Sequence, residues 1–193
     1  METTILEAKQ TNLNTIGLDK KHAKELAKKL NVLLANYSVF YQNVRGYHWN
    51  LKGENFFELH VKFEELYSHL YKKIDVIAER IATLGFIANH NFSVYHLESR
   101  IIEQTDVEGD ISAAEDIVES LYKVIAIERE ILSFATEMKD AGTYQLIGDV
   151  IKAQGDGILL FAMDKEGNIT LSGNYTVEKG DYLFTLQNVI NKR

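Results

Sequence analysis

Apolar residues recur along this chain at steps of three and four, the spacing of one face of an α-helix. One such run extends from about residue 20 to residue 47, and a second from about residue 57 to residue 84, where Gly85 is suited to end a helix. A third runs from about residue 110 to residue 140, and Gly142 lies at the start of a fourth. The pattern predicts four long helices.

The link between the second and third helices is long. It covers residues 86–110 and contains a short helical pattern at about residues 90–100. Ser112 and Glu115 match a capping box near the start of the third helix. A link of this length within a helical bundle indicates a crossover, and four helices with one crossover are the ferritin-like form of the four-helix bundle. We therefore expect an all-α fold of this kind.

The two ends of the chain do not continue the helical pattern. Residues 168–177 alternate like a β-strand, and residues 182–186 are a candidate second strand after a turn. We expect three regions: an N-terminal tail at 1–18, the helical domain at 19–164, and a C-terminal extension at 165–193 that forms a β-hairpin.

Composition narrows the class of protein. The chain of 193 residues contains no proline, which favours uninterrupted helices, and no cysteine, which excludes disulfides and thiolate metal sites. The N-terminus lacks a secretory signal pattern, and no apolar run reaches the length of a membrane span. We expect a cytoplasmic protein without a membrane partner. The net charge of −7 disfavours general attraction to DNA phosphates.

Five residues have side chains that bind metals and lie at helical spacing. They are His48, His60, Glu64, Asp75 and Glu79. Imidazole combined with carboxylate suits iron, manganese or zinc. On a helical wheel of the second helix, with Ile74 at zero, the last four fall at about 40°, 80°, 100° and 140°, which places them on one polar stripe beside the core.

One ion cannot reach both ends of this stripe. His60 and Glu79 are roughly 28 Å apart along the helix axis. The two pairs either serve different sites or are half-sites completed by another molecule. If two copies of the helix pack antiparallel about a twofold axis, two equivalent sites form, separated by roughly 22 Å. The alternative is an ordinary boundary histidine and a solvated acidic stripe.

A longer motif around these residues resembles a known family. His48-Trp-Asn-Leu-Lys-Gly-Glu-Asn-Phe-Phe-Glu-Leu-His60, followed by Asp75-Val-Ile-Ala-Glu79-Arg-Ile-Ala-Thr-Leu-Gly85, is similar to the Dps family of mini-ferritins, the DNA-binding proteins from starved cells. The resemblance covers about residues 20–154. It implies a cytoplasmic, sometimes nucleoid-associated, homo-oligomeric shell of twelve subunits that protects against oxidative stress.

The resemblance also implies an activity and roles for single residues. The family oxidises Fe(II), preferentially with hydrogen peroxide rather than dioxygen, and stores the ferric mineral, so the chain is expected to be a ferroxidase. Carried over by position, His48 and His60 bind iron from one subunit and Asp75 and Glu79 from its neighbour. Glu64 stands where the family often has aspartate, and other divalent metals suit the same ligands. Trp49 matches a tryptophan regarded as an electron donor, with plain packing as the alternative.

The chain departs from the family pattern in its pore and its fourth helix. Asp140 matches a pore acid, but Gln145 stands where a second acid is common. The usual ending of the fourth helix is missing after Gln154. We expect the apolar run at 158–163 to continue that helix; alternatively, residues 155–177 are an insertion and the helix resumes at Glu178.

The third departure concerns nucleic acid. DNA binding in the family commonly uses a mobile basic tail, whereas the first 18 residues here hold one lysine against two glutamates. We expect weak or absent DNA binding. The alternative function is a nucleoid-compacting protein with little iron oxidation.

Overall fold

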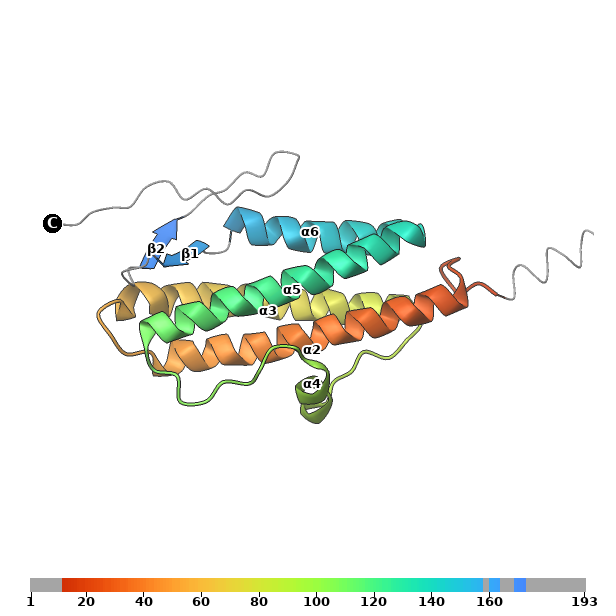
Figure 1. Cartoon of the computed structure of the whole chain (residues 1–193). Helices are drawn as coiled ribbons and strands as arrows, with labels where there is room; N and C mark the ends of the chain where they lie inside the picture. The colour runs from red at the N-terminus through yellow and green to blue at the C-terminus, as the bar shows by residue number, and fades with distance from the viewer. Residues whose placement is uncertain (1–11, 158–159, 164–168, 173–193) are drawn as a thin grey trace, which may run out of the picture.

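The computed structural model describes residues 12–157, 160–163 and 169–172 (Figure 1). Four long helices lie side by side in this part of the chain. They are α2 (Lys20–Asn50), α3 (Phe56–Thr83), α5 (Asp110–Glu137) and α6 (Ala141–Gly157). The crossover between α3 and α5 runs along the outside of the bundle and carries the short helix α4 (Phe92–Glu98). The all-α, ferritin-like bundle expected from the apolar pattern is confirmed.

Two helix ends show why the elements begin and end where they do. Asp19 caps α2, because its carboxylate accepts hydrogen bonds from the backbone N–H groups of Lys21 and His22. Gly85 follows α3 with a φ of 91°, and the N–H of Phe86 donates to the carbonyl of Ile81 at 3.2 Å. The predicted role of Gly85 at the end of the second helix is therefore confirmed.

The capping box expected at the third helix is wrong. Gly109 occupies the N-cap position of α5 and provides no side-chain hydrogen bond. Ser112 lies inside the first turn, where its hydroxyl donates to the carbonyl of Gly109 at 3.0 Å. Ser112 therefore cannot cap the helix from outside.

The bundle core is formed by aliphatic side chains from α2, α3 and α5 with a few large aromatic rings. Tyr37, Phe40 and Phe63 are the largest side chains that are fully buried. Burying such a side chain contributes roughly 1.5–3 kcal/mol. None of the described helices has the length and apolar character needed to cross a bilayer.

Two buried asparagines of α2 hold the crossover in place. The side-chain oxygen of Asn36 accepts hydrogen bonds from the backbone of Arg100 and Ile101. Asn43 donates to the carbonyl of Ile102 at 2.9 Å and accepts from the N–H of Gln104 at 3.0 Å. These bonds satisfy backbone groups that would otherwise be buried without partners.

The C-terminal region differs from its prediction. The helix α6 ends at Gly157, and strand β1 (Leu160–Met163) pairs antiparallel with β2 (Ile169–Ser172). The expected continuation of the fourth helix through residues 158–163 is therefore wrong. The predicted strand at 168–177 contains β2, but its expected partner at 182–186, like the resumption at Glu178, lies outside the described residues.

Candidate metal centre

His48 and His60 form a reciprocal pair at the corner between α2 and α3. The two imidazole rings are stacked, with centroids 3.8 Å apart and planes inclined by 20°. The Nδ1 of His48 lies 2.8 Å from the carbonyl oxygen of His60, and the Nδ1 of His60 lies 3.0 Å from the carbonyl oxygen of His48. The two residues are twelve positions apart, and the turn after α2 brings them together.

These hydrogen bonds determine which ring nitrogen is available. A carbonyl oxygen can only accept, so each Nδ1 must carry the hydrogen. The Nε2 of each neutral ring then keeps its lone pair. Metal-binding histidines usually donate their second N–H to a carbonyl or carboxylate in this way. The Nδ1 atoms of the pair are thus engaged, and the Nε2 atoms are the ring nitrogens that could bind a metal.

Aromatic rings enclose the pair. Phe56 stacks on His60 with centroids 5.1 Å apart, and Tyr67 meets the ring of His48 edge-on at 5.4 Å. His48 is buried with 9% exposure, whereas His60 is half-buried. The rings are therefore fixed in position while one side of the pair remains open.

The three carboxylates lie apart from one another along α3. Glu64 is exposed one turn after His60, and Asp75 and Glu79 are exposed further along the same helix. Within the described ranges, no three His, Cys, Asp or Glu side chains gather closely enough to hold a metal ion. The structure thus brings together the two histidines, but it does not bring Asp75 or Glu79 to them within one chain.

Trp49 does not pack into the core. Its side chain is 57% exposed, and the guanidinium of Arg45 lies over its ring at 4.5 Å from the centroid. This contact is a cation–π interaction, which holds the indole against α2.

The helical bundle and this motif agree with comparisons to known proteins. The ferritin-like domain family matches residues 27–162. A "DNA protection during starvation protein" of Porphyromonas gingivalis is 34% identical over 142 residues, which cover 74% of this chain and 89% of that protein. The chain belongs to the Dps family of ferritin-like proteins.

Solved structures of Dps proteins share the fold. A Dps protein of Vibrio cholerae, described as a member of the ferritin-like diiron-carboxylate superfamily, is 47% identical and superposes with a TM-score of 0.73 over 74% of this chain and 90% of that one. Antigen TpF1 of Treponema pallidum is 28% identical, with a TM-score of 0.69 over 71% of this chain and 88% of its own. Residues 163–193 lie beyond the family match.

Asp140, which matches a pore acid of the Dps family, has a structural role in this chain. It is 4% exposed and caps α6, and its carboxylate accepts two hydrogen bonds from the guanidinium of Arg80, at 2.7 and 2.8 Å. The hydroxyl of Thr143 donates a further bond at 2.6 Å. Burial alone would raise the pKa of Asp140, but the hydrogen bonds from Thr143 and Arg80 lower it below its usual value. These bonds occupy both carboxylate oxygens within the single chain, and a role of Asp140 at a pore between subunits stays a prediction.

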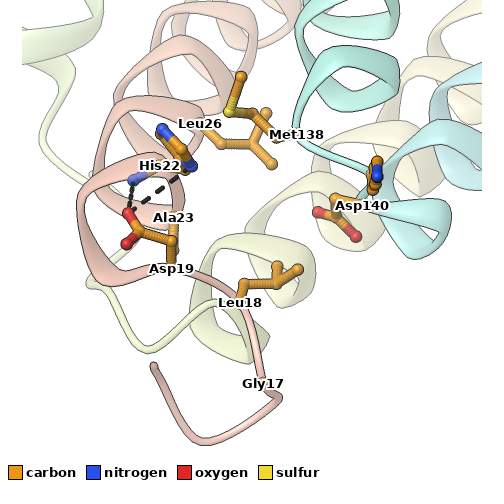
Figure 2. A pocket seen from close by; sticks show the side chains of 9 residues that line it. Gly17, Leu18, Asp19, His22, Ala23, Leu26, Met138 and Asp140 are labelled. Carbon is orange, nitrogen blue, oxygen red and sulfur yellow. Dashed lines mark hydrogen bonds and ion pairs between the residues drawn. The ribbon is translucent and has the colours of Figure 1, made fainter. Parts of the chain in front are cut away.

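A shallow hollow lies near Asp140. Its volume is about 200 Å³, and Figure 2 shows the side chains of Asp19 and His22 on one side and Asp140 on the other. Asp19 is 29 residues before His48 on or next to the same helix, roughly 43 Å along its axis. The carboxylates of Asp19 and Asp140 are both engaged as helix caps, because each accepts hydrogen bonds from backbone N–H groups in the first turn of its helix. The hollow is therefore separate from the histidine pair.

The bundle core contains two charged residues that the sequence patterns did not predict. Lys73 of α3 is 7% exposed and lies with its ammonium over the ring of Tyr37, and Glu128 of α5 is fully buried and accepts a hydrogen bond from the Tyr37 hydroxyl. Burial lowers the pKa of Lys73 to about 8, and the nearby carboxylate of Glu128 opposes this. The helical pattern could have indicated the burial of Lys73, because this residue falls among Leu66, Leu70 and Ile77 on the buried face of α3.

Proposed function

We propose that this Dps-family chain is a ferroxidase and iron-storage protein. In this proposal it binds Fe(II) at sites shared between two copies, oxidises it with hydrogen peroxide in preference to dioxygen, and stores the ferric product inside a shell of twelve subunits. The observation that most supports it is the His48–His60 pair, whose Nδ1 atoms are engaged by carbonyls and whose Nε2 atoms are available. The description of the Vibrio cholerae relative as a diiron-carboxylate protein supports iron as the substrate.

The proposed site takes its ligands from two subunits. His48, His60 and Glu64 lie near one end of α3, while Asp75 and Glu79 lie beyond the reach of the same ion. An antiparallel pairing of two α3 helices places the acidic half of one copy beside the histidine half of the other. The exposure of all three carboxylates in the single chain is consistent with ligands that meet a second copy.

The ligand types suit oxidation of iron that must enter and leave. Neutral imidazoles hold Fe(II), and the negative carboxylates favour the more highly charged Fe(III). Two Fe(II) ions supply the two electrons that reduce one hydrogen peroxide, with two protons, to two water molecules. No single-electron reduction to hydroxyl radical is then needed.

We propose that DNA binding is weak at physiological salt. Among the lysines at the start of α2, Lys28 is paired with Glu25 at 2.8 Å, and the ammonium of Lys29 lies over the ring of Phe134. Both side chains make contacts within the folded domain and do not belong to a mobile basic tail. The chain as a whole carries a net charge of −7. Protection of DNA would then come from removal of Fe(II) and peroxide.

The deciding experiment is an anaerobic Fe(II) titration followed by addition of hydrogen peroxide. We expect saturation near two irons per subunit or fewer, then oxidation much faster than in buffer. His60→Ala should abolish the fast phase. The matched control is His69→Ala, because His69 is an exposed histidine on the same helix outside the stripe.

Two results would refute the proposal. One is oxidation no faster than in buffer. The other is a fast phase that survives His60→Ala. Light scattering on the same samples tests the assembly, and a stable monomer with full activity would contradict the shared site.

A further inference from the structure

Three tyrosine rings lead away from the histidine pair. The ring of Tyr67 meets His48 at 5.4 Å between centroids, and Tyr67 meets Tyr41 edge-on at 6.1 Å. Tyr41 in turn lies 6.3 Å from Tyr71. Tyr41 and Tyr67 are half-buried, whereas Tyr71 is 62% exposed. A continuous row of oxidisable rings therefore connects the metal-binding corner with the surface of α3.

Trp49 is less suited to lose an electron, although it follows His48 in the sequence. The guanidinium of Arg45 lies 4.5 Å from the centre of its ring. A positive charge over the ring stabilises the neutral indole and disfavours the cation that forms when an electron leaves. Tyr67 is the tyrosine whose ring contacts His48, and no cation–π contact is found at Tyr67 within the described part of the chain.

We propose that Tyr67, Tyr41 and Tyr71 form a redox relay, and that Tyr67 rather than Trp49 is its entry point. This inference rests on the proposed ferroxidase activity. The relay acts when hydrogen peroxide meets a site that holds only one Fe(II). That ion can supply one of the two electrons that peroxide requires, and the relay supplies the other.

The step balances in electrons and atoms. One Fe(II), one tyrosine phenol, one hydrogen peroxide and one proton from water give one Fe(III), one neutral tyrosyl radical and two water molecules. The O–O bond breaks, and the phenol loses its electron and its proton together. The second electron prevents the release of hydroxyl radical from a half-loaded site.

The geometry directs the radical away from the histidine pair. The guanidinium of Arg45 also lies over Tyr41, at 5.2 Å, and this disfavours a cation radical on the middle ring. Tyr41 then serves as a bridge, and Tyr71, which is exposed in the single chain, is where the radical comes to rest. The oxidising equivalent is thus moved away from the histidine pair, to a ring one helical turn before Asp75.

The test is rapid-freeze electron paramagnetic resonance on the full assembly. Fe(II) is added anaerobically at less than one ion per proposed site, each of which holds two ions when full. Hydrogen peroxide is then added. We expect an organic radical whose spectrum narrows with ring-deuterated tyrosine but not with ring-deuterated tryptophan. Tyr67→Phe, which keeps the packing and removes the phenol, should reduce the signal to that of the iron-free control.

Two variants and one parallel measurement make the result specific. Trp49→Phe and Tyr122→Phe, the latter a 75% exposed tyrosine on α5, should both retain the signal. A signal that narrows with labelled tryptophan, persists in Tyr67→Phe, or is absent overturns the relay. Stopped-flow oxidation with sites filled by two Fe(II) separates the two proposals. Normal oxidation of the filled sites, together with no radical from the half-filled sites, refutes the relay alone, and slow oxidation of the filled sites refutes both.

Discussion

Arg80 and Asp140 join α3 to the start of α6 through a buried ion pair, in which the guanidinium Nη2 lies 2.7 Å from the carboxylate Oδ1. The Asp140→Ala variant loses both this pair and the N-cap of α6. Removing one partner of a buried pair costs about 3–5 kcal/mol, and the guanidinium here retains slight exposure, so we expect a loss of about 3 kcal/mol. Denaturant unfolding at one fixed subunit concentration measures it.

The control for this variant is Asp149→Ala. Asp149 is exposed on the same helix, and surface substitutions usually change stability by less than about 0.5 kcal/mol. Equal losses in the two variants would show that the ion pair contributes nothing.

The same carboxylate predicts a pH dependence. Its pKa is lower in the folded chain than its ordinary value of 3.8. A group with a lowered folded pKa stabilises the fold above its unfolded pKa, and this contribution is lost as the pH falls through the folded pKa. The stability difference between the wild type and Asp140→Asn should stay constant from pH 7 to about 5 and shrink below about pH 4. A difference unchanged at pH 3 would contradict this.

Gly142 and Gly148 make a matched pair in α6. A Cβ at Gly142 would lie 3.0–3.1 Å from the guanidinium of Arg80, whereas a Cβ at Gly148 meets nothing within 4 Å among the described residues. Replacing glycine by alanine inside a helix stabilises it by about 1 kcal/mol where space allows. We expect Gly148→Ala to raise the melting temperature. Gly142→Ala should give no gain or a loss, because Arg80 is held by Asp140 and cannot move freely.

The buried charges in the core predict a pairwise effect. Lys73→Met removes the buried ammonium whose charge interacts with the carboxylate of Glu128, and it should cost about 3 kcal/mol. The double variant Lys73→Met, Glu128→Gln should recover most of this loss, because glutamine still accepts from the Tyr37 hydroxyl. Lys62→Met, which breaks the exposed Lys62–Glu65 pair, is the control and should change stability little. Equal stability of the single and double Lys73 variants would contradict the pairing.

A mixing experiment tests whether two chains share each iron site. His60→Ala removes the histidine half, and the variant Asp75→Asn, Glu79→Gln removes the acidic half. Each should be inactive alone. When the two are unfolded together and refolded, a mixed pair contains one site with all ligands intact, and fast oxidation should return. Inactive mixtures that contain properly assembled shells would refute shared sites.

The helical part of the fold could be predicted because one apolar stripe in each helix is buried, which gives a periodic signal. The second helix was expected at about residues 57–84 and is found at Phe56–Thr83, and the third starts at Asp110 as expected. The strand β1 was mistaken for helix, because a short apolar run between glycines has no periodicity that separates a strand from a buried helix.

The candidate site was predictable in part for a related reason. Helical spacing placed Glu64, Asp75 and Glu79 on one stripe of α3, because that spacing depends on a single helix. The stacking of His48 on His60 depends on the turn between two helices, which has no period in the sequence. The ion pair between Arg80 and Asp140 was not predicted, because the two residues are 60 positions apart in the sequence and the family pattern suggested a role for Asp140 in a pore.

The reciprocal bonds of His48 and His60 have a consequence for affinity. Each ring is held by the carbonyl of the other residue, so the corner between α2 and α3 closes and the two imidazoles become ordered in the same folding event. In the proposed iron site, a cation that arrives later would not have to immobilise them. This preorganisation would lower the entropic cost of binding, which immobilised side chains otherwise raise by about 0.5–1.5 kcal/mol each.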